Sequence, residues 1–453
     1  MSATYQQARL SRDPRFDGKF FVAVKTTHIF CRPICPANLP LEKNVEYYEL
    51  AESAILSGYR PCLRCRPDSA PDSFAWQGVD TTLNRAIKLL KQYPELSINE
   101  ITTKLGVSPR YLRQLFQHKL GMSPKQFQLF NKVLFAKRLL HESQISVEQV
   151  AMASGFSSSR RLQSQFKKIT GLTPSNIRKV KSVSMPNQNI NLKLNYRPPY
   201  HWEHIKDFLF LRAIKGIETI TDNSYSRTFV IEQEPGWFKM TFNPKHTYFD
   251  LEIKLNNLSH LRSVIMNIER LFDLKADPVA IHNQLLATGL AKEHLVRGLR
   301  LPGVWNCFEA GCRAILGQQI SVKSAISLLT KLSENLAEKH QTLAYFPSAS
   351  AVANSNLEFL KIPNSRKQTL IDFASYMQNN EKNPLNHSID DLILIKGIGP
   401  WTVSYVKLRG QSSPDIWLDS DLIIKKQLAQ YKISPQKAEP WRSYLTLQLW
   451  NLA

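Results

Sequence analysis

The sequence predicts an α+β protein built from several successive domains. Three observations predict this organisation: two closely spaced cysteine pairs near the amino terminus, a helical pattern that repeats in the next part, and alternating strand patterns followed by helices in the remainder. A chain of 453 residues is long enough for about three domains. With 43% hydrophobic residues it can bury ordinary cores, so extended disorder is not expected.

The chain is strongly basic. It has 59 Lys+Arg against 37 Asp+Glu, a formal net charge of +22, which favours a polyanionic partner. The opening residues lack an apolar signal core, and no run reaches the length of a membrane span. The expected location is therefore cytoplasmic and nucleoid-associated, with no membrane partner. Six cysteines in a reducing compartment indicate metal binding or reactive thiols rather than disulfides.

Four cysteines in residues 1–75 form two close pairs. Cys31 and Cys35 are separated by three residues, and Cys62 and Cys65 by two. Two such pairs favour a tetrahedral thiolate site for one Zn²⁺, which would supply much of the folding energy of so short a domain. The alternative is four unrelated buried cysteines, which the pairing disfavours.

These pairs lie in the segment FDGKFFVAVKTTHIFCRPICPANLPLEKNVEYYELAESAILSGYRPCLRCRPD, which resembles the amino-terminal domain of Ada adaptive-response proteins. The resemblance implies that Cys31 is both a zinc ligand and the acceptor of a methyl group from a methylphosphotriester in DNA. Cys35, Cys62 and Cys65 would be the other ligands. The zinc would be structural and would also keep the sulfur as a nucleophilic thiolate. Methylation would make the site less negative and strengthen DNA binding; a purely structural zinc site is the alternative.

The surroundings of the four cysteines are basic, which suits contact with DNA. The basic side chains are Lys25, Arg32, Arg60, Arg64 and Arg66. Pro36, Ala37 and Asn38 follow Cys35, where the resemblance leads us to expect more basic residues. This departure weakens the expected DNA contact but not the expected metal site.

Residues 76–180 carry an internal repeat of helical patterns. Capping boxes begin at Ser97 and Ser146, and each opens a short helix followed by a second helical run. The second runs match, with Phe116 and Phe166 at equivalent positions and a long helix expected between the halves, over about 124–142. Two helix-turn-helix units joined in this way could enter successive segments of the major groove.

This pattern resembles the DNA-binding domain of AraC-type regulators over nearly all of the region. The resemblance implies binding to double-stranded DNA, transcription regulation, and RNA polymerase as a further partner. The candidate DNA-facing residues are Ser108, Arg110 and Arg113 in the first unit and Ser158, Ser159, Arg160 and Arg161 in the second. At each arginine the alternative is a solvated helix face. Ada proteins join the zinc and helix-turn-helix modules in this order, which supports both interpretations.

The remainder of the chain begins with a polar, non-periodic stretch, residues 181–190, which we expect to be a linker. Residues 191–260 contain strand patterns and predict a small antiparallel sheet. These patterns cover 227–233, 237–242 and 248–255. Residues 261–453 are predicted to be helical. Cys307 and Cys312 have no second pair nearby, so we expect them in the core.

A short turn in this helical region combines glycines with a helix start. Gly397 and Gly399 lie between two helical patterns, and Pro400 suits the first position of a helix. Such a turn presents free backbone N–H groups that favour a phosphate. On spacing alone, however, a glycine-rich connection between helices is more often a plain turn.

A cluster of acids, Asp415, Asp419 and Asp421, follows the turn. A carboxylate near a phosphate grip indicates chemistry on a nucleic-acid backbone or sugar. The stretches GIGPWTVSYVKLRG and DIWLDSDLIIKKQ resemble the helix-hairpin-helix DNA glycosylase superfamily, and within it the AlkA-type 3-methyladenine glycosylases. The resemblance runs from about residue 192 to the end. It implies that Asp421 is the catalytic acid, with Asp419 as a second choice.

The resemblance implies further roles. The enzyme would flip a damaged nucleotide out of the stack and hold its electron-poor base on Trp401, Tyr405 and Trp450; the alternative for each is a plain core aromatic. Asp421 would stabilise positive charge on the deoxyribose and help water attack. Gly397 and the following Gly399 would hold a phosphate beside the lesion. No organic cofactor is implied.

Two positions narrow the expected reaction. Bifunctional relatives place a Schiff-base lysine where this chain has Trp401, so we expect a monofunctional glycosylase without strand-cutting activity. Some relatives insert an apolar wedge into the base stack from the position of Gln319. A glutamine there can fill the gap and hydrogen-bond the orphan base, but it is a weaker wedge.

Three interpretations of the whole chain compete. The first is a fused alkylation-damage protein that releases bases such as 3-methyladenine and switches transcription through Cys31. The second is a transcription regulator with a catalytically inactive glycosylase-like DNA-binding region, and the third is a zinc-structured adaptor with no chemistry. Asp421 together with the hairpin favours the enzyme. We expect a monomer that binds alkylated DNA and has no recognisable acceptor domain for O6-methylguanine.

Overall fold

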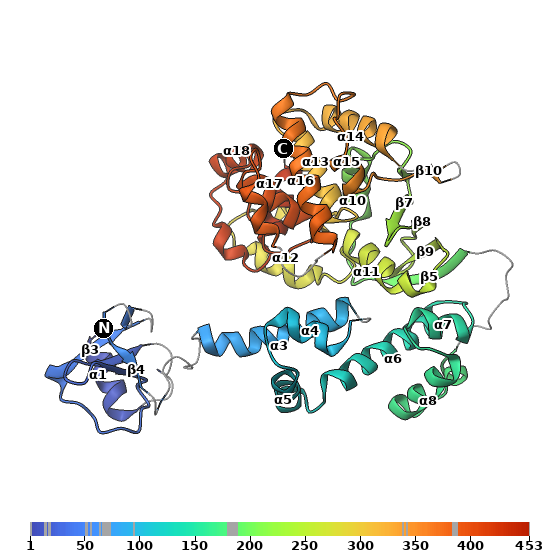
Figure 1. The fold of residues 1–453 in the computed structure, drawn as a ribbon. Coiled ribbons are helices and arrows are strands. Elements are labelled where there is room, and N and C mark those ends of the chain that lie inside the picture. The colour runs from blue at the N-terminus through green and yellow to red at the C-terminus, as the bar shows by residue number, and fades with distance from the viewer. Residues whose placement is uncertain are drawn as a thin grey trace. The chain divides into compact units, whose positions relative to one another are not determined.

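The computed structural model confirms the predicted α+β organisation (Figure 1). It describes residues 2–12, 16, 20–49, 53–54, 57–62, 65, 74–93, 96–178, 189–337, 339–340, 343–382 and 388–452. The chain forms two compact units, Met1–Leu129 and Phe130–Ala453. Among the helices in these ranges, none combines the length and the apolar character needed to cross a membrane.

The first unit begins with a small sheet beside a helix. The four strands lie in the order β3-β1-β2-β4, and all neighbours are antiparallel except β2 and β4. The elements are α1 (Ser2–Ser11), β1 (Phe21–Val24), β2 (Ile29–Cys31), η2 (Glu42–Asn44), β3 (Val45–Tyr48) and β4 (Arg60–Pro61). Phe20 and Phe30 are fully buried. The buried Arg9 donates to Tyr47 and Glu42, which ties α1 to the sheet.

Helices form the next region, as the repeat predicts. They are α3 (Phe74–Gln92), α4 (Ile98–Leu105), α5 (Pro109–Leu120), α6 (Pro124–Glu142), α7 (Val147–Ala153), α8 (Ser159–Thr170) and α9 (Pro174–Ile177). Both capping boxes are formed: Ser97 with Glu100, and Ser146 with Gln149. Gly106 ends α4 in the left-handed conformation, with φ of 66°, which glycine adopts without strain. Helices α4 and α5 belong to the first compact unit, and α7 to α9 to the second.

A five-stranded antiparallel sheet opens the remaining part of the second unit. The strand order is β5-β9-β8-β7-β6. The strands are β5 (Asn189–Asn195), β6 (Glu218–Ile220), β7 (Ser224–Ile231), β8 (Glu234–Phe242) and β9 (Tyr248–Leu255). Alternate residues of β9 are buried, among them Phe249, Leu251 and Ile253, because successive side chains of a strand point to opposite faces. The three predicted strands are confirmed, and β5 and β6 extend the sheet.

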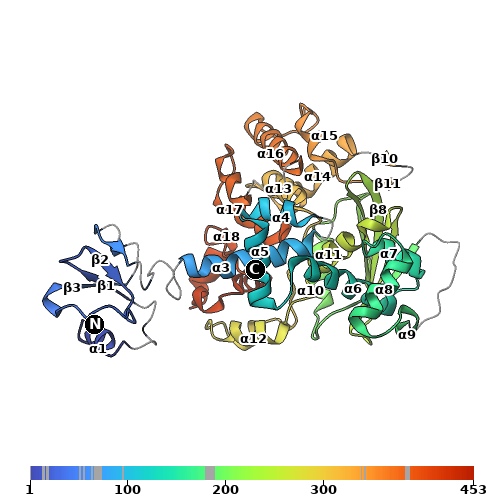
Figure 2. The same ribbon diagram turned by 60° about the horizontal axis from the view of Figure 1, so that its bottom comes forward.

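Helices make up most of the rest of the chain. They are α10 (Trp202–Phe210), η4 (Leu258–His260), α11 (Leu261–Leu271), α12 (Pro278–Leu286), η5 (Lys292–His294), α13 (Cys307–Gly317), α14 (Val322–Leu336), α15 (Ala349–Ala353), α16 (Asn364–Lys382), η6 (Ile389–Leu394), α17 (Pro400–Tyr405), η7 (Val406–Gly410), α18 (Leu422–Gln430), η8 (Pro435–Ala438) and α19 (Arg442–Asn451), with a hairpin of β10 (Lys339–His340) and β11 (Leu343–Ala344). Both views group α13, α14, α15 and α16 together (Figure 1 and Figure 2). Cys312 of α13 is fully buried and Cys307 packs at the edge of the same core, as expected.

A buried ionic network joins the sheet to α13. Arg227 of β7 contacts Glu309 at 2.8 Å, and Arg313 contacts both Glu309 and Glu218 at 2.7 Å. All four side chains are almost completely buried, so removing one partner would leave an uncompensated charge in the interior. The network holds α13, which ends at the site described below, against the sheet.

Asp273 is buried between α11 and α19, and its titration makes the free energy of unfolding depend on pH. Its Oδ2 accepts hydrogen bonds from the Tyr444 hydroxyl at 2.8 Å and the Leu301 N–H at 3.1 Å. Burial raises the pKa of the Asp273 carboxyl from 3.8 to about 6, against the opposing effects of these hydrogen bonds and of Arg300. The folded state therefore binds more protons than the unfolded state between these two pKa values. The contribution of Asp273 to stability is largest below pH 4 and falls as the pH rises through 6.

Asp273→Asn is expected to remove this pH-dependent loss, because a single amide oxygen can accept both hydrogen bonds. The difference in the free energy of unfolding, variant minus wild type, should increase by about 2–3 kcal/mol when the pH is raised from about 4 to about 7.5. Urea unfolding of both proteins at the two pH values measures this difference. A difference that stays constant with pH would show that Asp273 is not the titrating group.

Candidate active site and metal centre

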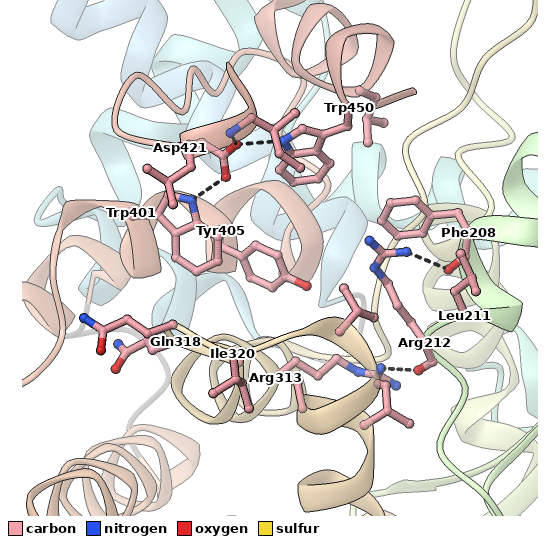
Figure 3. Close-up of a pocket in the computed structure, with 18 of the residues that line it drawn as sticks. Phe208, Leu211, Arg212, Arg313, Gln318, Ile320, Trp401, Tyr405, Asp421 and Trp450 are labelled. Carbon is pink, nitrogen blue, oxygen red and sulfur yellow. Dashed lines mark hydrogen bonds between the residues drawn. The ribbon is translucent and has the colours of Figure 1, made fainter. Parts of the chain in front are cut away.

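A cavity of about 940 Å³ lies among the helices of the second unit (Figure 3). Its walls come from six parts of the chain: α10 and the turn after it, the end of α13 with the turn that follows, the first half of α14, the hairpin together with α17, the start of α18, and the end of α19. Asp421, Trp401, Tyr405 and Trp450 all line it. The fold thus brings together the predicted acid and the three predicted pocket aromatics.

Asp421 is held by four N–H groups. It is the N-cap of α18, where its Oδ1 accepts from the backbone N–H of Ile423 at 3.0 Å and of Ile424 at 3.2 Å. The same oxygen accepts from Trp450 Nε1 at 3.2 Å, and Oδ2 accepts from Trp401 Nε1 at 3.0 Å (Figure 3). These contacts leave the carboxylate little freedom to rotate and fix it at the wall of the cavity.

The aromatic residues form a continuous wall beside this carboxylate. The Trp401 and Tyr405 rings stack with centroids 5.1 Å apart and an interplanar angle of 25°. Tyr405 is held in turn by the buried Arg409, whose Nη1 donates to the phenol oxygen at 3.2 Å. Trp401 and Trp450 therefore combine two functions, since their rings line the cavity while their N–H groups orient Asp421.

Of the three predicted acids, only Asp421 lines the cavity. Asp415 instead forms a two-point ion pair with Arg442, at 2.7 and 2.8 Å, and Asp419 is exposed on the turn before α18. The three acids are neighbours in the sequence, but of the three only Asp421, the first choice, faces the cavity. Asp415 faces the start of α19, where Arg442 pairs its charge.

The glycine turn has the expected position between η6 and α17. Gly397 has φ of 91°, and a Cβ there would lie 2.3 Å from Thr369 Oγ1, so both conformation and space require glycine. Gly399 has an extended backbone, with φ of −104°, and a Cβ would meet nothing within 4 Å. Pro400 occupies the first helical position, as predicted. Gly399 thus leaves open space at the start of the helix rather than relieving strain.

The turn after α13 contacts this hairpin directly. Gln318 donates to the Gly397 carbonyl oxygen at 3.1 Å and to Thr402 Oγ1 at 3.3 Å. Gln319 is exposed and has φ of 58°, a conformation that costs energy for a residue other than glycine. Strained backbone of this kind is concentrated at functional sites, which suits the predicted role of Gln319 at the mouth of the cavity.

The sequence did not predict the residues that α10 and the turn after it contribute to the opposite wall. The Arg212 guanidinium lies 3.7 Å from the centroid of the Phe208 ring and donates to the Phe208 carbonyl oxygen at 3.2 Å (Figure 3). Burial lowers the pKa of Arg212 to about 10. These residues lie about two hundred positions before Asp421 and belong to no spacing pattern, so only the fold shows that they face it.

The four predicted metal ligands form a compact cluster in the first unit. The sulfur atoms of Cys31, Cys35, Cys62 and Cys65 all lie within 4.8 Å of one another. Tetrahedral Zn²⁺ with Zn–S bonds of 2.3 Å would place its sulfurs about 3.8 Å apart, so the donor set fits zinc. Cys35 and Cys65 are buried, whereas Cys31 and Cys62 are half-buried. Cys31 ends β2 and is thus one of the two ligands that a molecule from solution could reach.

The basic residues around this cluster differ in their surroundings. The backbone N–H of Arg32 donates to Cys65 Sγ at 3.3 Å, and its guanidinium donates to the Cys65 carbonyl oxygen at 3.3 Å. Lys25 pairs with Glu46 at 3.3 Å, and Arg60 is exposed. Arg64 and Arg66 lie outside the described residues.

The four candidate arginines of the helix-turn-helix region, Arg110, Arg113, Arg160 and Arg161, are exposed on α5 and α8. The hydroxyl groups of Ser108 and Ser158 instead stabilise the starts of α5 and α8. Each caps the helix that follows it, accepting from the backbone N–H of Tyr111 or Arg161. Their hydroxyls are therefore engaged by the helix, and the arginines are the stronger candidates for contact with DNA.

Three protein-family models match the chain in succession. They are described as the metal binding domain of Ada, over residues 4–68, a helix-turn-helix domain, over residues 101–180, and the AlkA N-terminal domain, over residues 191–306. The order of these matches is the order of modules that the sequence predicts.

Individual proteins show the same combination. A probable bifunctional transcriptional activator/DNA repair enzyme AlkA from Mycobacterium tuberculosis is 29% identical, covering 97% of this chain and 94% of that protein. DNA-3-methyladenine glycosylase 2 of Escherichia coli is 31% identical, covering 57% of this chain and 95% of that protein. The bifunctional transcriptional activator/DNA repair enzyme Ada of Escherichia coli is 35% identical, covering 38% of this chain and 48% of that protein.

Proposed function

Because the chain belongs to the AlkA family of DNA glycosylases, here fused to an Ada-type zinc domain and a helix-turn-helix domain, we propose that it excises alkylated bases such as 3-methyladenine. It is a DNA repair enzyme that also carries a transcription-regulating part. The proposed modules are residues 1–75 for methyl acceptance, 76–180 for DNA binding, 181–190 as a linker whose last two residues already belong to β5, and 191–260 with 261–453 for base excision.

The observation that carries the excision proposal is the setting of Asp421. A carboxylate fixed by four N–H groups stands at the wall of an aromatic cavity large enough for a purine base. Trp401, Tyr405 and Trp450 offer ring faces on which an electron-poor base can stack. Arg212 on the opposite wall offers a hydrogen-bond donor to the edge of the base.

In the proposed reaction, the bond between the base nitrogen and C1′ of the deoxyribose breaks, and its electron pair leaves with the base. Asp421 faces the positive charge that develops on the sugar and stabilises it electrostatically. A water molecule then adds to C1′ and gives its proton to the carboxylate or to solvent. A charge that is already oriented needs no reorganisation during this step, and the two indole N–H groups supply that orientation.

The hairpin is proposed to hold the DNA backbone next to the flipped nucleotide. The open space at Gly399 and the free N–H groups at the start of α17 suit a phosphate oxygen. Gln318 joins this turn to the one bearing Gln319. The groups proposed to grip the phosphate and to fill the gap left by the flipped base are therefore held together.

The reaction is expected to stop at base removal. Trp401 occupies the position from which a lysine would form an imine with C1′, and its N–H is committed to Asp421. Duplex DNA bearing one lesion should stay intact after incubation with the protein and break only after hot alkali, as a denaturing gel will show. Strand breakage before alkali, in equal amount to base release, would contradict a monofunctional mechanism.

Cys31 is proposed as the acceptor of a methyl group from a methylphosphotriester. Its sulfur would attack the methyl carbon while the carbon–oxygen bond breaks, leaving a phosphodiester anion and a thioether. The half-buried position of Cys31 supports this role, because the sulfur must reach a phosphate on DNA. Zinc bound by the four cysteines would keep the sulfur as a thiolate and hold the domain together.

Exposed Arg110, Arg113, Arg160 and Arg161 are proposed to contact double-stranded DNA at the regulated promoters, with α5 and α8 as the helices that enter the major groove. Methylation of Cys31 would reduce the negative charge of the zinc site and strengthen this binding. RNA polymerase would then be the further partner of the activated, monomeric protein.

Incubation of the intact protein with N-methylated duplex DNA tests the proposed excision. Mass spectrometry of the supernatant should identify free 3-methyladenine that accumulates over many turnovers. Binding of the same DNA without release of any base would instead identify a catalytically inactive DNA-binding region.

A further inference from the structure

Strand β5 forms one edge of the five-stranded sheet, and a segment of the helix-turn-helix region contacts it. Ser143, which directly follows α6, forms an isolated antiparallel bridge with Leu192 of β5. Both residues are buried, and the hydroxyl of Ser143 is turned back to the Leu139 carbonyl oxygen. An uncovered edge strand exposes unpaired backbone groups and invites aggregation. The bridge places the end of α6 against this edge at Leu192.

Ion pairs cross the same boundary. Arg138 of α6 contacts Glu269 of α11 at 2.6 Å, and Lys275 contacts the other carboxylate oxygen of Glu269 at 2.7 Å. Only 8% of the Glu269 side chain is exposed. Glu142, one turn after Arg138, pairs with it at 2.7 Å and accepts a hydrogen bond from Asn195 of β5 at 3.2 Å. Charges removed from water in this way need their partners, unlike exposed surface pairs.

An apolar contact completes the boundary. The Phe135 ring is only 8% exposed although α6 is a helix of the DNA-binding region, and the Arg262 guanidinium of α11 lies 5.3 Å from its centroid. A desolvated cation–π contact of this kind adds to the burial of the ring. Backbone pairing, ion pairs and aromatic packing therefore all join α6 and its end to β5 and α11.

We propose that the second helix-turn-helix unit is docked on the edge of the glycosylase sheet, so that α8 and the excision cavity are carried by one structural unit. The surface formed by β5 and α11 is therefore occupied by an earlier part of the same chain, which precedes residues 181–190. Promoter DNA held by α8 would then place the excision site at a fixed distance from it. The division of the chain between Leu129 and Phe130, rather than near residue 180, agrees with this arrangement.

Tryptophan fluorescence separates the two sides of the boundary. Residues 77–201 contain no tryptophan, whereas seven of the eight tryptophans follow residue 201. Thermal unfolding of the full chain followed by this signal therefore reports mainly on the glycosylase. Arg138→Met, a change within the helix-turn-helix region, is expected to lower the midpoint of this transition by about 5 °C, because it leaves the buried Glu269 carboxylate with only the exposed Lys275 as an ionic partner.

Lys137→Met is the matched control, since Lys137 is the exposed neighbour on α6 and loses the same charge. It should leave the midpoint at the wild-type value. The double variant Arg138→Met/Glu269→Gln should be less destabilised than the sum of its single variants, because the two residues face each other. Equal midpoints for Arg138→Met and Lys137→Met, or additive effects of Arg138→Met and Glu269→Gln, would overturn the docking proposal.

Discussion

Asp421→Asn is expected to slow release of 3-methyladenine on the order of 10³-fold, a loss of about 4 kcal/mol of transition-state stabilisation. The amide has the shape of the carboxylate but carries no charge to face the developing positive sugar. It also places an N–H₂ group against one of two indole N–H donors, Trp401 or Trp450, so the orientation of the side chain suffers as well. Asparagine is as good an N-cap as aspartate, so α18 should remain folded. Single-turnover rates of base release measure the effect.

Asp419→Asn is the matched control. It removes the same charge two residues earlier, from an exposed side chain that does not line the cavity. Its rate should stay within about threefold of wild type, since an exposed charge at this distance is largely screened by solvent. If Asp419→Asn loses activity and Asp421→Asn keeps it, the catalytic assignment belongs to Asp419.

The second large effect is expected at Cys31. Cys31→His should retain zinc, because three cysteines and one histidine form a common structural site, but it should accept no methyl group. Its zinc site would also carry one negative charge fewer, as the methylated wild type does. Affinity for promoter DNA at about 0.1 M salt should therefore rise on the order of tenfold without any exposure to methylated DNA. Metal analysis, peptide mass spectrometry and DNA titration measure the three outcomes.

Cys62→His distinguishes the loss of the methyl acceptor from the change in charge of the zinc site. Cys62 is the other half-buried ligand, so the substitution changes the zinc site in the same way. This variant should also bind DNA more tightly, but it should still gain one methyl group on Cys31. Methyl found on a different cysteine in the wild type would contradict the assignment of the acceptor.

Local sequence signals predicted the parts of the fold that local physics determines. The capping boxes at Ser97 and Ser146 fix helix starts through hydrogen bonds within four residues, and α6 has the predicted bounds, Pro124–Glu142. The cysteine pairs predicted a cluster because a metal site needs ligands at short spacing. Gly397 was predicted from its turn, and its φ of 91° shows why no other residue suits it.

Contacts between distant segments could not be predicted in this way. The acids Asp415, Asp419 and Asp421 are close in sequence, yet Arg442, which pairs with Asp415, lies at the start of α19. Similarly, Arg212 faces the cavity from the turn after α10, and Arg138 of α6 contacts Glu269 of α11, on the other side of residues 181–190 in the sequence. No periodicity or spacing in the sequence predicts such pairs, because they depend on how the helices and the sheet pack against one another.

The most direct test of the whole account is one incubation of the intact zinc-loaded protein with methylated duplex DNA, analysed by mass spectrometry for both products. We expect free 3-methyladenine in solution, dependent on Asp421, and one methyl group on the peptide that contains Cys31. A protein that binds this DNA but releases no methylated base would contradict the central claim that the Asp421 cavity is a glycosylase active site.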